Sequence, residues 1–292
     1  MEQGGEAYSV NITSQCRKRT NLTAMQIEHL KRIEISLPFV ADLAHAYLYL
    51  YVQTKEPGKM LVLKHYRPHP FFSEVELTGE GAFVSTLEEP LIAAAFAKGK
   101  FIQGQREWRF GINLEMYVQP IKCGNDVIGV VSLETGHSYA NSSNYHQLMD
   151  TALYLLDYAK KPLDKDEFHP MSPGTGIIIA DSNNRIVFAN LSANRIYRAL
   201  GIASLVGCRM QDRELSAMLH KETIDSSRPY EREIQIRDFV LVQRDIKLEE
   251  AGMLKRRIML LSDVSELRKK EREIKIKSAV IQEIHHRVKN NL

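Results

Sequence analysis

The stretch from Glu266 to the last residue carries a helical pattern of apolar and polar positions. Apolar residues recur there at every seventh position: Leu267, Ile274, Ile281 and Val288. Ile284 joins the same stripe, and lysine and glutamate occupy the other faces. Such a repeat is typical of a seam that pairs with another helix. Since no glycine or proline interrupts the stretch, we expect one continuous coiled-coil helix over residues 266–292.

Two adjacent histidines, His285 and His286, lie in this helix. His286 is two residues from Ile284, which is about 200° around a helix, so its side chain points away from the stripe, whereas His285 lies closer to it. A water-facing imidazole can bind a metal, act as an acid or base, or accept a phosphoryl group. A metal is disfavoured because Asn290, at the i+4 position, is a poor ligand. The plain alternative is a solvated helix that happens to carry two histidines.

Residues 1–160 alternate between helical and extended patterns. Residues 1–20 look like a loose lead-in, and Thr20 or Asn21 can cap a helix in which Pro38 introduces a kink. The expected strands are 48–52, 61–65, 101–104, 115–122 and 126–134, and the expected later helices are 91–98 and 145–159. Trp108 is expected in a polar loop. The order predicts an antiparallel sheet with helices packed on it.

A charged, proline-broken segment at 161–169 is the expected interdomain linker. A second domain follows over 170–265, built from a strand hairpin, two short helices and three further strands. The expected strands are 176–181, 185–190, 232–236, 239–248 and 256–261, and the expected helices are 193–200 and 212–220. The fold class is therefore α+β, with two antiparallel-sheet domains followed by the long helix.

Composition narrows the functional class. The 39 basic and 36 acidic residues nearly balance, which argues against direct nucleic-acid binding as the main activity. No apolar run reaches the roughly 18 residues of a membrane-spanning helix, so no membrane insertion is expected. The three cysteines are far apart and form no Cys-x-x-Cys pair. We therefore expect neither a disulfide framework nor a metal site, and a reducing cytoplasm as the location.

The string from Glu283 to Leu292, Glu-Ile-His-His-Arg-Val-Lys-Asn-Asn-Leu, resembles the phosphoacceptor box of sensor histidine kinases in the subfamily whose box reads His-Arg-Val-Lys-Asn. The resemblance implies that His286 is the phosphorylated residue and leaves His285 as an alternative. Glu283, Arg287, Lys289 and Asn290 would orient the imidazole and stabilise the phosphoryl charge.

The earlier segments resemble the sensor domains that accompany this subfamily. Residues 1–160 resemble a GAF-type domain through motifs such as Arg67-Pro68-His69-Pro70 and Val130 to Thr135. Residues 170–265 resemble a PAS domain. Its last triplet, Asp263-Val264-Ser265, is expected to cap the exit helix while tying it to the sheet.

A proline-fixed loop and the acidic residues after it are the candidate ligand site. The candidates for a small polar or charged ligand are Arg67, His69, Glu80, Glu88 and Glu89. The alternative is that they are ordinary exposed charges of loops and turns. The family resemblance suggests ethanolamine or a nucleotide as the signal, and the sequence alone does not choose between them or between the two domains.

Together these observations predict the sensory and phosphoacceptor part of a cytoplasmic, dimeric sensor histidine kinase. No Gly-x-x-x-x-Gly-Lys motif or ATP-lid sequence occurs, so ATP is expected to be bound by a catalytic domain that this piece lacks, and the piece alone should be inactive. The resemblance implies a response regulator as partner and suggests one of the RNA-binding antiterminator type. The alternative is a GAF–PAS ligand-binding dimerisation module that controls a non-kinase output.

Overall fold

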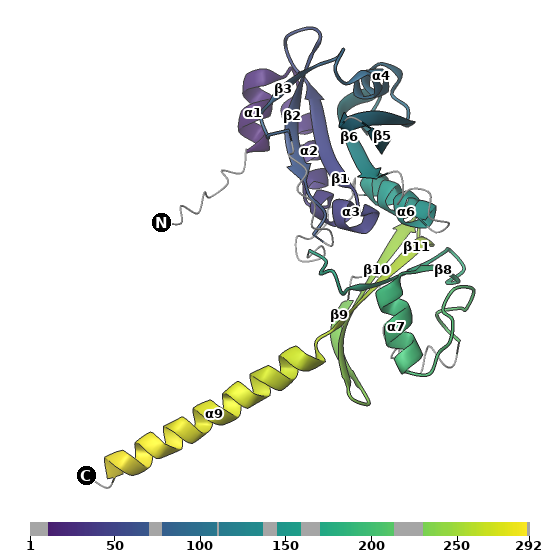
Figure 1. Cartoon of the computed structure of the whole chain (residues 1–292). Coiled ribbons are helices and arrows are strands. Elements are labelled where there is room, and N and C mark those ends of the chain that lie inside the picture. Colours follow the sequence, from purple (N-terminus) through teal and green to yellow (C-terminus); the bar gives the residue numbers. More distant parts are fainter. Residues whose placement is uncertain are drawn as a thin grey trace. The chain divides into compact units, whose positions relative to one another are not determined.

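The computed structural model describes residues 11–69, 78–109, 111–136, 145–158, 170–212 and 230–290. The chain divides into two compact units, unit 1 over Met1–Pro173 and unit 2 over Gly174–Leu292, and each contains an antiparallel sheet (Figure 1). The α+β class with two antiparallel-sheet units is thereby confirmed. The expected linker at 161–169 and nearly all of the expected helix 212–220 lie outside the described residues.

Unit 1 is built on a six-stranded sheet in the order β3-β2-β1-β6-β5-β4. Its strands are β1 (Tyr47–Gln53), β2 (Lys59–Tyr66), β3 (Phe83–Ser85), β4 (Ile102–Arg109), β5 (Ile112–Cys123) and β6 (Asp126–Gly136). The first two expected strands are present as β1 and β2, and they pair antiparallel with Tyr49 opposite His65. The expected strands 115–122 and 126–134 are present in β5 and β6, which form a hairpin with Cys123 opposite Asp126 across the turn.

Helices cover both faces of this sheet. They are α1 (Ile12–Arg19), α2 (Ala24–Glu34), α3 (Leu37–Ala44), α4 (Pro90–Lys98) and α6 (Tyr145–Tyr158). Residues of α4 pack with Tyr49, Tyr51 and Val130 on one face of the sheet. On the other face, a Cβ atom at Gly129 would come within 3.2 Å of Leu30 in α2. As expected, α4 ends at Gly99, which takes the left-handed conformation that a side chain disfavours.

Three local expectations for unit 1 are wrong. Residues 12–19 form the helix α1, capped by Asn11 and anchored by the buried Cys16, where the sequence suggested a loose lead-in. The next helix is capped by Thr23, which shares a capping box with Gln26, and not by Thr20 or Asn21. Trp108 lies in β4, which continues well beyond the expected 101–104, because pairing with β5 extends it to Arg109.

Unit 2 contains a five-stranded antiparallel sheet in the order β8-β7-β11-β10-β9. Its strands are β7 (Gly176–Ala180), β8 (Ile186–Ala189), β9 (Tyr230–Ile236), β10 (Phe239–Glu250) and β11 (Met253–Asp263). The helix α7 (Leu191–Ala199) packs on one face and shares an apolar core with β7, β10 and β11. All five expected strands and the first of the two expected helices are therefore present.

The long helix α9 (Ser265–Asn290) leaves this sheet without interruption (Figure 1). Asp263 accepts hydrogen bonds from the backbone N–H and the hydroxyl of Ser265, at 3.0 and 2.6 Å. The Ser265 hydroxyl oxygen accepts from the backbone N–H of Val240 on β10 at 2.8 Å. One residue thus joins the helix start to the sheet, as the sequence predicted.

Candidate functional site

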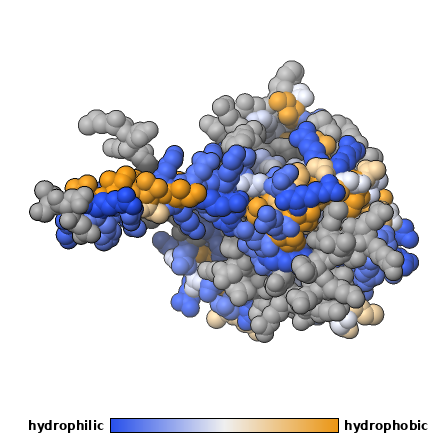
Figure 2. All heavy atoms as spheres, turned by 90° about the horizontal axis from the view of Figure 1, so that it is seen from below, coloured by the Kyte–Doolittle hydropathy of each residue, from blue (hydrophilic) through white to orange (hydrophobic). Residues whose placement is uncertain are grey.

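The apolar side chains of α9 lie open to solvent. Seven of them are 52 to 65% exposed: Leu267, Ile274, Ile276, Val280, Ile281, Ile284 and Val288. In Figure 2 a hydrophobic stripe is visible along part of this helix. From Ile274 to Val288 the apolar positions span about 160° of the helix circumference. Such a face is wider than the seam of a two-stranded coiled coil and is typical of a helix with more than one neighbour.

The two histidines differ in their position relative to this stripe. At about 100° per residue, His285 is about 40° from Ile281 and about 60° from Val288. His286 is about 140° from Ile281 and about 160° from Val288. Both imidazoles are exposed in the single chain, so a partner helix on the stripe would lie beside His285 and leave His286 open.

The residues around His286 are charged and exposed. Arg287 Nε donates a hydrogen bond of 2.8 Å to Glu283 Oε1, one turn earlier. This ion pair and the exposed Lys289 lie on the same end of the helix as His286. The side chain of Asn290 is outside the described residues, although its backbone completes α9. Arg287 and Lys289 therefore place positive charge and hydrogen-bond donors near the imidazole of His286.

A second cluster of functional groups lies inside unit 1, on the sheet face that α4 covers. Arg106 on β4 reaches two carboxylates, with 2.6 Å to Glu89 at the start of α4 and 2.8 Å to Glu134 on β6. Ser132 donates a further hydrogen bond of 3.0 Å to Glu134. The Glu134 side chain is 1% exposed and that of Arg106 is 26% exposed. The guanidinium group of Arg106 therefore connects β4 with the start of α4 and with β6.

Burial controls the protonation of this cluster. It raises the pKa of Glu134 to about 7, although Arg106 and the Ser132 hydroxyl act in the opposite direction. Burial also raises the pKa of Glu89, again against the nearby Arg106. The pKa of Tyr49 rises to about 12, from burial and from the negative charge of Glu134. Because its pKa is near neutrality, the buried Glu134 carboxyl group can change its charge under physiological conditions.

The structure places the five candidate ligand residues in separate surroundings. Glu89 alone joins the Arg106 cluster. Glu88 accepts a hydrogen bond of 2.8 Å from the backbone N–H of Ser85. Glu80 forms an ion pair of 3.3 Å with Lys64, which also pairs with Glu34 on α2. Their ligand-binding roles stay predictions.

The last two candidates lie on the loop after β2. His69 contacts the buried carboxylate of Asp42 at 3.1 Å through Nδ1, and Arg67 is exposed. The structure therefore does not gather the five candidates into one pocket within the described residues.

Arg106, Glu134, Ser132 and Asp42 were not among the candidate site residues chosen from the sequence. For two of them a signal exists, because Ser132 and Glu134 alternate with apolar residues in a strand and so share a face with the buried Val130. Arg106 and Asp42 give no such signal, since their partners are distant in the sequence and depend on strand register or helix packing.

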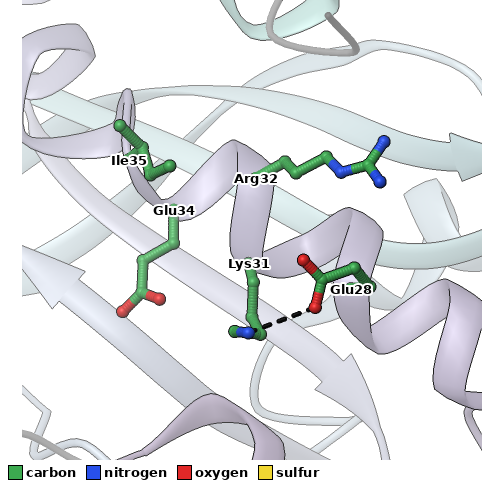
Figure 3. A pocket seen from close by; sticks show the side chains of 5 residues that line it. All are labelled: Glu28, Lys31, Arg32, Glu34 and Ile35. Atoms are coloured by element: carbon green, nitrogen blue, oxygen red, sulfur yellow. Dashed lines mark hydrogen bonds and ion pairs between the residues drawn. The ribbon is translucent and has the colours of Figure 1, made fainter. Parts of the chain in front are cut away.

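A surface hollow of about 360 Å³ runs along α2 (Figure 3). Among the described residues its lining is formed by Glu28, Lys31, Arg32 and Glu34 of α2 and by Ile35, which follows that helix. Lys31 and Glu28 form an ion pair of 3.1 Å, so part of the charge is already neutralised. Within the described residues no cluster of His, Cys, Asp and Glu has the geometry of a metal site, and no helix there is long and apolar enough to cross a membrane.

Residues 12–152 match a family model described as "Histidine kinase PdtaS, GAF domain". Over 303 aligned residues the chain is 23% identical to the "Sensor histidine kinase PdtaS" of Mycobacterium tuberculosis (strain ATCC 25618 / H37Rv) and to that of Mycolicibacterium smegmatis. Each alignment covers 94% of this chain and 60% of the relative. The chain thus spans about 60% of the length of the curated relatives it matches.

A solved structure titled "Sensor region of a sensor histidine kinase" has the same fold. Its TM-score to this chain is 0.63 at 19% sequence identity, and the match covers 88% of this chain and 99% of that one. At this identity the likeness concerns the fold alone. The family match over residues 12–152 agrees with it, and unit 1 has a GAF-like sensor fold.

Proposed function

We propose that the chain is the sensory and phosphoacceptor part of a dimeric sensor histidine kinase, in which His286 accepts the phosphoryl group. The observation that carries the proposal is the position of this imidazole. It is exposed on an uninterrupted helix, nearly opposite the apolar stripe. The GAF-type domain at the other end of the chain and the 23% identity to PdtaS kinases support the same class.

The stripe supports a dimer. Seven exposed apolar side chains on one helix are unfavourable in water, and a second copy of the chain would cover them. Near Leu267 the stripe is narrow and suits a two-stranded coiled coil. Beyond Ile274 it widens to about 160°, which suits a bundle where each helix has two neighbours. The phosphoacceptor residues lie in this wider part.

In the proposed reaction, the imidazole Nε2 of His286 attacks the γ-phosphorus of ATP. A P–N bond forms, the bond from phosphorus to the bridging oxygen breaks, and ADP leaves. A separate catalytic domain of the whole protein would bind the ATP. Arg287 and Lys289 would stabilise the negative charge of the transferred group, while Glu283 holds Arg287 in place. The phosphoryl group would then pass to an aspartate of a response regulator.

Unit 2 would transmit the signal as a PAS-type domain. Its strand order, with α7 between β8 and β9, supports this assignment. The junction at Ser265 would carry movement of β10 directly into α9. Arg268 on α9 adds a second connection, since it pairs with Glu233 on β9 at 2.7 Å. A rigid helix fixed at its first turn can pass a rotation to His286.

The test is phosphorylation with labelled ATP after the chain is joined to a histidine-kinase ATPase domain. We expect label in the wild type and in His285→Gln, and none in His286→Gln. Acid-labile, alkali-stable label would identify phosphohistidine. Label that persists in His286→Gln would refute the residue assignment. No label in any variant, with the ATPase domain shown to bind ATP, would favour a ligand-binding dimerisation module with another output.

A further inference from the structure

Asp42 is a buried carboxylate that the proposed chemistry does not use. It lies in α3, where every residue except Pro38 is buried, and its own exposure is 0%. A helix enclosed in this way holds the carboxylate in a fixed position. An ionised carboxylate without water is stable only when hydrogen-bond donors surround it.

The donors come from two segments far apart in the sequence. Asp42 Oδ1 accepts from the backbone N–H of His69 at 2.7 Å and lies 3.1 Å from His69 Nδ1. Asp42 Oδ2 accepts from the backbone N–H of Met171 at 2.9 Å. Each oxygen of one carboxylate therefore fastens a different segment to α3.

The two segments have distinct places in the chain. His69 is on the loop after β2, and its side chain is 52% exposed, so a ligand from solvent can reach it. Met171 is buried, and unit 2 begins three residues later at Gly174. Asp42 thus links an accessible imidazole to the segment that leads out of unit 1.

We propose that Asp42 is a latch, in the sense that its carboxylate couples ligand contact at the His69 imidazole to the hydrogen bond that holds Met171. Met171 belongs to the segment that leads out of unit 1. A ligand with an acceptor oxygen, such as a carboxylate or phosphate, would compete with Asp42 Oδ1 for the His69 Nδ1–H. Loss of this donor leaves Oδ1 with fewer hydrogen bonds, so the buried carboxylate rotates and its bond to Met171 weakens. By reciprocity, release of Met171 weakens the hold on His69.

The role in signalling rests on the proposed function, whereas the latch itself can be tested without kinase activity. The measurement is the hydrogen exchange rate of the Met171 amide in the whole chain, by NMR or by mass spectrometry of short peptides. The variants are Asp42→Ala and His69→Ala. His146→Ala is the matched control, because His146 is an exposed histidine of the same unit that contacts Gln147.

In Asp42→Ala we expect exchange at Met171 to be faster by at least about tenfold, as for loss of a hydrogen bond to a charged group. In His69→Ala, which removes only the imidazole, we expect an increase of about two- to tenfold. His146→Ala should leave the rate unchanged.

An unchanged rate in a folded Asp42→Ala chain would refute the latch. If that variant fails to fold, His69→Ala decides: an unchanged Met171 rate there would refute the coupling. A His286→Gln chain should give the wild-type rate, so failure of the kinase proposal and failure of the latch are separate results.

Discussion

The helices α3 and α9 represent two opposite ways in which this chain uses apolar residues. In α3 every position except Pro38 is buried by the chain itself. In α9 none of the described side chains is buried, and seven large apolar ones are more than half exposed. Other parts of unit 1 cover α3, whereas the apolar side chains of α9 are left exposed. The same contrast holds for two polar side chains. Hydrogen-bond donors surround the buried carboxylate of Asp42, whereas the imidazole of His286 is exposed to solvent.

From this difference we expect α3 to contribute to the stability of the fold and α9 to contribute to association with another molecule. Substitutions in α3 should change the free energy of unfolding, whereas substitutions on the stripe of α9 should change association and leave the sheets intact. The following predictions test that separation, beginning with the largest expected effect.

Replacement of Phe39 by Ala should lower the free energy of unfolding of unit 1 by about 3–5 kcal/mol, because it leaves a cavity in a fully buried helix. Phe101→Ala is the matched control, since this phenylalanine is 45% exposed. Denaturant unfolding followed by circular dichroism measures both. Equal losses for the two variants would contradict the burial of α3.

Replacement of Ile281 by Asp should raise the dissociation constant of the dimer at least about tenfold, since it places a charge in the proposed seam. Sedimentation equilibrium measures the constant. Gln282→Asp, one position away and outside the stripe, should have little effect. Association that survives Ile281→Asp would show that α9 is not the seam.

The charge of Glu134 should make stability depend on pH. Its folded pKa of about 7 lies above the ordinary value of 4.5, so the folded state binds more protons between these values. Its contribution to stability is therefore fully present below about pH 4.5 and is lost as pH rises through about 7, with a slope of up to about 1.4 kcal/mol per pH unit.

Relative to wild type, Glu134→Gln should thus become more stable as pH rises from 5 to 8. Urea unfolding at several pH values measures the difference. Glu56→Gln is the control, because Glu56 is an exposed residue paired with Lys59. A difference that is constant with pH would show that Glu134 stays ionised in its buried site.

The smallest effect is expected for Glu283→Gln. The pair with Arg287 is exposed on both sides, so its loss should change helix stability by only about 0.3–0.5 kcal/mol. A larger loss of phosphorylation than of helicity in this variant would show that Glu283 acts by orienting Arg287.

Periodic patterns predicted most of the elements correctly. The heptad of Leu267 to Val288, the neighbouring strand patterns at 115–122 and 126–134, and the triplet Asp263 to Ser265 are all local signals. The structure has the helix, the two strands and the connection between helix and sheet that they predict. The helix α1 was missed because only two of its eight residues, Ile12 and Cys16, are buried.

The site was harder to predict than the fold. Glu89 was selected from the sequence, but its partner Arg106 is 17 residues away, and Glu134 joins them only through the register of β4, β5 and β6. Asp42 looks like a single acidic residue in an apolar helix, and its contacts with His69 and Met171 span 27 and 129 residues. Such contacts arise from tertiary packing and leave no periodic signal.

The most direct test of the central claim compares the reactivity of the two adjacent imidazoles, His285 and His286, in the proposed dimer. Diethyl pyrocarbonate modifies accessible neutral imidazoles, and mass spectrometry locates the product. The account predicts that His286 reacts at the same rate in the dimer and in the Ile281→Asp variant, whereas His285 reacts more slowly in the dimer. Protection of His286 by dimerisation, with His285 left reactive, would contradict the account.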